Sequence, residues 1–375
     1  MSGLRPASFG AQPAGERLSR IERSPHFDTV AGIFRNPPAP RTEPAPAPGR
    51  GTMLRSLLRR EGRRPEFPIP VQRPSLGAPP DSGLRLTWLG HATVLAEIDG
   101  QRVLFDPVWG ERCSPFGFAG PRRFHPVPLP LAELGPVDAV MISHDHYDHL
   151  DMPTVQALAA ARVPFVVPLG VGAHLEHWGV PTELVSELDW HEHVRIGGLT
   201  LTCSPAHHFC GRGLRNKQHT LWSSWAVAGP EHRIFHSGDT GYFPGFADIG
   251  AEHGPFDATM IQVGAYSEFW PDIHMTPEEG LRAHQDLEGG TLLPIHWGTF
   301  NLAPHLWAEP AERTLAAASS AGVRTAVPMP GAPFEPASAT LPVMPWWQGK
   351  PASAAGSAAA GSAVPTPPPG PGPVA

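Results

Sequence analysis

The sequence predicts an α/β domain, and two patterns support this prediction. Short apolar runs suited to buried strands, such as residues 84–90 and 137–143, alternate with helical patterns such as residues 152–161 and 275–287. Clusters of histidine and aspartate follow directly after several of the apolar runs. Because binding sites in α/β folds gather where strands end, we expect the functional site at one edge of a sheet.

Composition divides the 375-residue chain into three parts. Its 48 prolines are more than twice the usual share of about 5% and crowd toward the two ends. We therefore expect a Pro/Arg-rich and partly ordered extension over residues 1–80, and a folded domain over residues 81–337. Residues 338–375 are expected to form a low-complexity, disordered tail.

A basic segment, residues 52–64, lies inside the N-terminal extension. It places five arginines around an apolar stripe that includes Leu54 and Leu58. Two interpretations stay open: a surface helix that docks on the domain, or a contact with a membrane surface.

Charge and cysteine content narrow the protein's class. A net charge of −7 argues against a general nucleic-acid binder. The three cysteines form no C-x-x-C pair, so a disulfide scaffold is not expected and a reducing cytoplasm is. The first twenty residues contain no signal-peptide core, and no run of about 18 apolar residues occurs. We expect a cytoplasmic protein, with peripheral contact at a membrane as the open alternative.

The first predicted elements form a hairpin. Residues 84–90, 92–98 and 101–107 read as strands, and Asp99-Gly100 between the last two is a strong hairpin turn signal. Residues 137–143 predict a short buried strand, and residues 152–161 predict a helix.

Three later segments repeat the plan of a strand that ends in a polar cluster: residues 233–242, 257–266 and 291–300. A helix is predicted over residues 275–287. Its start is marked by Thr276 as the cap, Pro277 at the first position and Glu279 closing a capping box.

The chemistry centres on "SHDHYDHLD", residues 143–151, which follows a predicted strand. Imidazole nitrogens and carboxylate oxygens are the ligands of zinc, with iron or manganese as alternatives. His144 and His146 form one pair, and Asp148 and His149 form a second, so two metal ions are indicated. Other strand ends offer further ligands: His208, Asp239 and His296.

The motif H-x-H-x-D-H at residues 144–149 resembles the signature of the metallo-β-lactamase superfamily. Within it, the chain is similar to the N-acyl-phosphatidylethanolamine-hydrolysing phospholipase D family and its bacterial relatives. The similarity spans roughly residues 20–330. It is carried by stretches such as "TWLGHATVL", "SPAHHFCGRGL", "HSGDTGY", "HMTPEEG" and "IHWGTFNLA", and extends to "ERSPHFDTVAGIFRNP" near the N-terminus. The resemblance implies that residues 81–337 are a hydrolase domain with an αβ/βα sandwich fold and metals at one edge.

The resemblance also implies roles for individual residues. One zinc ion is assigned His144, His146 and His208, and the other Asp148, His149 and His296. Asp239 bridges both ions, and Asp106 orients a ligand histidine from behind. His207 is the alternative to His208. His91 and His274 lie near the site, as substrate or ligand contacts or as buried structural histidines, and Tyr147 and Tyr266 are weaker candidates.

The implied activity is direct hydrolysis by a metal-bridging hydroxide, with two zinc ions as cofactors and Asp148, Asp239 and His274 as the catalytic residues. The expected enzyme is a phosphodiesterase of phospholipase D type acting on N-acylated or related phospholipids. The alternatives are a lactonase or phosphoesterase of the same fold acting on a small molecule, and a metal-binding protein without turnover. The chain departs from its relatives at residues 267–273, a short stretch without Lys or Arg where they carry a longer basic segment.

Overall fold

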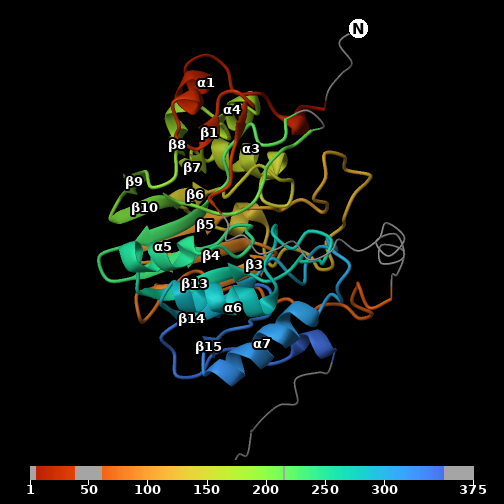
Figure 1. Ribbon diagram of the computed structural model, residues 1–375. Coiled ribbons are helices and arrows are strands. Elements are labelled where there is room, and N and C mark those ends of the chain that lie inside the picture. Colours follow the sequence, from red (N-terminus) through yellow and green to blue (C-terminus); the bar gives the residue numbers. More distant parts are fainter. Residues whose placement is uncertain (1–5, 39–60, 214–215, 350–375) are drawn as a thin grey trace, which may run out of the picture.

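The computed structural model describes residues 6–38, 61–213 and 216–349 (Figure 1). Two seven-stranded sheets form the centre of this described part. The first sheet has the order β16 (Pro333–Phe334), β3 (Leu84–Gly90), β4 (Thr93–Ile98), β5 (Gln101–Phe105), β6 (Ala139–Met141), β7 (Phe165–Pro168), β8 (Val185–Leu188). The second has the order β15 (Arg324–Thr325), β14 (Gly289–Ile295), β13 (Phe256–Gln262), β12 (Arg233–His236), β11 (Ser224–Ala228), β10 (Leu199–Ser204), β9 (His193–Ile196).

Helices cover the outer faces of both sheets. In Figure 1, α3 (Met152–Ala160) and α4 (Gly172–His177) lie beside β6–β8 of the first sheet. The helices α5 (Gly245–His253), α6 (Pro277–Asp286) and α7 (Glu309–Ala321) lie beside the second. Among the described residues, the remaining short elements are α1 (Gly15–Glu22), the hairpin β1 (Phe27–Asp28) and β2 (Ile33–Phe34), and four 3-10 turns at Ala7–Phe9, Leu131–Glu133, Thr182–Leu184 and Trp346–Gln348.

Alternation along the strands explains this layering. Val94 and Ala96 of β4 point into the core that contains residues of both sheets, whereas Leu95 between them belongs to the core under α3 and α4. The ring of Phe105 in β5 stacks on His236 in β12, with 4.8 Å between ring centroids. Strands buried on both faces read as continuous apolar runs, as these do. The expected αβ/βα sandwich is therefore confirmed.

Local signals in the sequence fold as predicted. Asp99 and Gly100 adopt φ values of +49° and +82°, which suits the type I′ turn of a two-residue hairpin between β4 and β5. The side chain of Thr276 accepts a hydrogen bond from the backbone N–H of Glu279, and the Glu279 carboxylate accepts one from Thr276. This capping box begins α6 where the sequence predicts it.

Both ends of the described chain pack on the sandwich. Arg17 of α1 forms ion pairs with Glu176 and Glu187 of the domain. Trp346 and Trp347 are buried, and the ring of Trp346 stacks on Trp297 at 5.3 Å. The expected disordered tail is thus wrong for residues 338–349, because two large aromatic side chains bury their surface there. Residues 39–60, with most of the basic segment, and residues 350–375 lie outside the described residues.

No helix in the described ranges is both long and apolar enough to cross a bilayer.

Trp346→Ala should lower the free energy of unfolding by about 3–5 kcal/mol, because it removes a large buried ring from the core. Met344→Ala is the matched control, since Met344 is exposed and its loss should change stability by less than about 0.5 kcal/mol. Chemical denaturation of both variants measures the difference. Equal stability would show that residues 338–349 contribute nothing to the core.

Candidate metal centre

The candidate residues converge because their strands end at one edge of the sandwich. The loop after β6 carries residues 144–149, the loop after β10 carries His208, the loop after β12 carries Asp239, and His296 directly follows β14. The turn between β3 and β4 adds His91. The structure brings together all seven residues that the sequence predicts as ligands.

A first group consists of His144, His146, His208 and Asp239, with one candidate ligand atom from each lying within 4.8 Å of the others. The Nδ1 atom of His146 lies 2.8 Å from Nε2 of His144 and 3.4 Å from Nε2 of His208. Oδ2 of Asp239 lies 3.8 Å from Nε2 of both His144 and His208. Three imidazoles and one carboxylate around one point match a tetrahedral zinc site.

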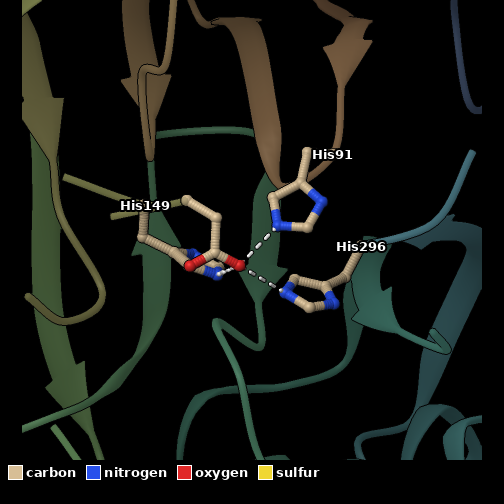
Figure 2. Close-up of side chains that lie close together, drawn as sticks. His91, His149 and His296 are labelled. Carbon is tan, nitrogen blue, oxygen red and sulfur yellow. Dashed lines mark hydrogen bonds and ion pairs between the residues drawn. The ribbon is translucent and has the colours of Figure 1, made fainter. Parts of the chain in front are cut away.

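A second group consists of His91, Asp148, His149 and His296, and Figure 2 shows the three histidines facing one carboxylate oxygen. This oxygen is Oδ2 of Asp148. It lies 2.9 Å from Nε2 of His91, 3.3 Å from Nε2 of His296 and 3.6 Å from Nε2 of His149. His91 therefore lies inside the cluster rather than beside it.

Asp239 lies between the two groups. Its Oδ2 is 3.2 Å from Nε2 of His149, and its Oδ1 is 3.0 Å from Nε2 of His296. The same carboxylate faces His144 and His208 of the first group. This is the position of a ligand shared by two cations.

Several buried polar atoms at this point lack a hydrogen-bond partner among the described residues. They are Nε2 of His149, Nε2 of His296, Oδ1 of Asp239 and Nδ1 of His274. An unsatisfied buried group costs about 1–3 kcal/mol, so such atoms are rarely gathered in one place without a ligand. Bound metal ions would satisfy Nε2 of His149, Nε2 of His296 and Oδ1 of Asp239, and the donor set therefore fits a metal centre.

Residues behind the cluster fix the orientation of His149. Its Nδ1 lies 2.7 Å from Oδ2 of Asp106. The same carboxylate accepts a hydrogen bond from the backbone N–H of Ser143 at Oδ1 and one from the Ser143 hydroxyl at Oδ2. A proton on Nδ1 leaves the lone pair of Nε2 directed at Asp148 and Asp239. Asp106 thus occupies the orienting position that the resemblance implies.

The electrostatics suit a cation. Burial opposes ionisation of Asp148 and Asp239, yet the surrounding histidines, His149 first, hold the pKa of both carboxyls well below the usual value. Burial and neighbouring imidazoles hold the pKa of His144 well below normal, so its nitrogen is free to ligate. Burial disfavours charge on His149, but three carboxylates raise its pKa well above normal. The site attracts positive charge.

Other predicted residues lie apart from the cluster. His207 belongs to neither group, and its Nδ1 lies 3.0 Å from the carbonyl oxygen of Asp272. The Tyr147 hydroxyl donates to the backbone of Arg212, and the Tyr266 hydroxyl donates to Glu309. His274 is the exception: it forms a third candidate group with Asp239 and His296, and its Nδ1 lies 3.9 Å from Oδ2 of Asp239.

A pocket beside His296 was not expected from any pattern in the sequence. Its walls are mostly apolar, and Arg63 from the far end of the basic segment joins them. The pocket is lined by Arg63, Phe124, Ala265, His296, Trp297, Gly298, Phe300, Asn301, Leu302, His305 and Trp307. Arg63 is largely buried there, and burial lowers its pKa.

Comparison with known proteins agrees with this geometry. The model of the beta-lactamase superfamily domain matches residues 101–297. The chain belongs to the metallo-β-lactamase superfamily. The matched residues include all seven candidate ligands, and His296 lies next to the last matched residue.

Two relatives and two solved structures illustrate the similarity. An uncharacterized protein of Mycobacterium tuberculosis is 49% identical over 347 residues, which is 92% of each chain. N-acyl-phosphatidylethanolamine-hydrolyzing phospholipase D 1 of Caenorhabditis elegans is 40% identical over 232 residues, 59% of this chain and 65% of that protein. The metallo hydrolase Igni18 of Ignicoccus hospitalis and an isothiocyanate hydrolase from Delia radicum gut bacteria share the fold. Their TM-scores are 0.52 and 0.53 at 21% and 22% identity, each covering 67% of this chain and 98% of the other.

Asp239→Ala should lose more bound metal than any other single ligand variant, because one carboxylate faces both groups. Elemental analysis of the purified protein should find close to two divalent ions per wild-type chain. Asp151→Asn is the matched control: Asp151 caps α3 at the end of the loop after β6, which carries four of the candidate ligands, and asparagine serves equally well as a cap. Full metal content in Asp239→Ala would contradict the shared-ligand assignment.

Proposed function

We propose that this chain, a metal-dependent hydrolase of the metallo-β-lactamase superfamily, binds two zinc ions and hydrolyses a phosphodiester. The preferred substrate class is an N-acylated or related phospholipid, cleaved on the headgroup side of phosphorus. The observation that carries the proposal is Asp239, one carboxylate that faces two histidine groups. A shared carboxylate is typical of two-metal sites that perform in-line displacement at phosphorus.

The residues proposed to hold the metals follow from the two groups: His144, His146 and His208 for one ion, Asp148, His149 and His296 for the other, and Asp239 for both. Two zinc ions at this point would lower the pKa of a coordinated water toward 7 and neutralise charge on the phosphoryl oxygens.

The reaction forms one bond and breaks one. The oxygen of water bonds to phosphorus, the bond from phosphorus to the headgroup oxygen breaks, and the leaving alkoxide takes up a proton. Asp148 is proposed to accept a proton from the attacking water, since its carboxylate is ionised and is the most exposed of the metal-group carboxylates. The sequence contains no G-x-S-x-G motif of the kind that carries a nucleophilic serine. The proposed reaction therefore uses water as the nucleophile.

His274 is proposed to contact the substrate. Its ring lies 5.1 Å from that of His208 and 5.2 Å from that of His296, and its side chain is 13% exposed while the neighbouring ligands are almost fully buried. Burial lowers its pKa to about 3, so the imidazole is neutral at neutral pH and carries one proton. A neutral imidazole at the open side of the cluster can donate a hydrogen bond to a phosphoryl oxygen.

The pocket beside His296 has aromatic and aliphatic walls and one cation, Arg63. It supports the proposal through the chemistry of its walls and not through its size, because its free space is only about that of one water molecule. Arginine pairs well with phosphate through two parallel hydrogen bonds. The similarity to a protein named as a phospholipase D of N-acyl-phosphatidylethanolamine adds independent support.

A second candidate function is hydrolysis of a small lactone or phosphoester. The narrowness of the same pocket favours it, because a long acyl chain needs more room than the closed walls beside His296 provide. Both candidates use the same metal centre and differ in the group that the pocket accepts.

The zinc-loaded protein should cleave N-acyl-phosphatidylethanolamine in detergent micelles faster than it opens simple lactones. His274→Gln should lower kcat more than about tenfold while metal content stays at the wild-type level, because His274 is not among the proposed ligands. Product analysis must find phosphatidic acid and an N-acylethanolamine. If the protein cleaves lactones but no phospholipid, the phosphodiesterase proposal is wrong and the second candidate function replaces it.

A loop beside the site is expected to contact the lipid surface. Phe118 is 84% exposed and its ring packs 5.5 Å from that of Phe116, which in turn contacts Phe9 beside Tyr147 of the metal loop. Exposed aromatic rings near a site favour insertion at a bilayer interface.

Phe118→Asp should weaken binding to anionic vesicles by about tenfold, because transfer of a phenylalanine ring from water is worth about 1.5–3 kcal/mol. Turnover of vesicle-presented lipid should fall equally, and hydrolysis of a water-soluble diester should not change. Val30→Asp is the control, since Val30 is an equally exposed apolar residue on the β1–β2 turn. Loss of activity on both substrates would mean that the loop is structural.

A further inference from the structure

The main chain of His208 is held by a side chain from a remote part of the sequence. The side-chain amide of Asn36 donates a hydrogen bond from Nδ2 to the carbonyl oxygen of His208, at 2.8 Å. The backbone N–H of His208 donates in return to Oδ1 of Asn36, at 2.9 Å. Only one orientation of the amide satisfies both contacts, so the two hydrogen bonds act as a single clamp between residues 172 positions apart.

The N-terminal hairpin fixes the position of Asn36. Phe34, two residues earlier in β2, is fully buried and packs 5.1 Å from Phe27 of β1. The backbone N–H of Phe34 donates to the carbonyl of Gln218. Pro37 follows Asn36 and restricts it to an extended conformation. The amide therefore reaches His208 from a rigid base.

The clamp completes the hydrogen bonding of His208. Its Nδ1 lies 3.1 Å from the carbonyl oxygen of Ile273, an acceptor, so this nitrogen carries the proton. The backbone N–H and carbonyl are engaged by Asn36. The atom that remains is Nε2, which faces Nδ1 of His146 and Oδ2 of Asp239. The other polar atoms of His208 all form hydrogen bonds, and these hydrogen bonds hold Nε2 toward the first metal group.

We propose that Asn36 is a positioning residue for the first metal group, acting through His208. The N-terminal segment is on this view a part of the metal centre, although it lies outside the matched superfamily domain of residues 101–297. The inference rests on the proposed metal-binding function, because it assigns His208 a metal to hold. Partners that orient a ligand from behind typically change metal affinity by 10–100-fold when they are lost.

The experiment compares three purified proteins: wild type, Asn36→Ala and Arg17→Ala. Arg17 is the matched control, because it ties the same N-terminal segment to Glu176 and Glu187 without contacting His208. Each protein is titrated with a zinc chelator and the bound metal is measured. Each is also loaded with Co²⁺, whose visible absorption reports ligand geometry. The melting temperature of the metal-free form shows whether the segment still docks.

Asn36→Ala should lower the affinity for one of the two zinc ions by 10–100-fold and leave the affinity for the other unchanged. It should also alter the Co²⁺ absorption spectrum. Arg17→Ala should keep both affinities and the wild-type spectrum, even where its melting temperature falls. Asn36→Asp should behave as Asn36→Ala, since it places a carboxylate oxygen against the carbonyl of His208 in place of the donor.

Three outcomes would overturn the inference. If Asn36→Ala keeps the wild-type zinc affinities and Co²⁺ spectrum, the positioning role of Asn36 is refuted, while the proposed metal centre stands. Equal loss in Asn36→Ala and Arg17→Ala would assign the effect to docking of the whole segment. Absence of bound metal in the wild-type protein would refute the metal-binding function together with this inference.

Discussion

The carboxylate of Asp239 is the constraint on which the rest of the structure depends. It is a buried negative charge, and isolated burial of such a charge is prohibitive unless cations or donors surround it. Histidines from the loops after β6, β10 and β14 meet around it, so three remote strand ends must come to the same point. A sandwich of two sheets, each with strands that end at a common edge, satisfies this requirement with rigid elements behind every ligand.

The second group is braced in the same way as the first. The backbone N–H of His296 donates to the carbonyl of His91, and both residues adopt positive φ values of +65° and +55°. Such backbone conformations cost free energy in residues other than glycine and cluster at functional sites. The Thr299 hydroxyl accepts from the backbone N–H of His91. The strain is thus stored where the turn that carries His91 contacts the turn that carries the ligand His296.

The two ends of the described chain both support loops of the metal centre. The N-terminal hairpin brings Asn36 to His208. Near the C-terminus, Trp346 stacks on Trp297, the residue after His296. Segments that composition assigns to linkers therefore support the loops that carry the ligands. These contacts explain how irregular loops can hold the ligand histidines in fixed positions.

The sequence was sufficient for features that depend on near neighbours along the chain. The hairpin at Asp99-Gly100, the capping box at Thr276 and the ligand cluster at residues 144–149 are local patterns, and each folds as its residues predict. The resemblance left the role of His91 open between a contact at the site and a buried structural histidine. The roles of Arg63, Asn36 and Trp346 could not be read from the sequence, because each depends on a partner far away in the chain. Composition even argued against the last two, since proline-rich flanks resemble disordered linkers. A pattern in the sequence records local propensity, whereas a long-range hydrogen bond or ring contact exists only once the sheets have brought its two partners together.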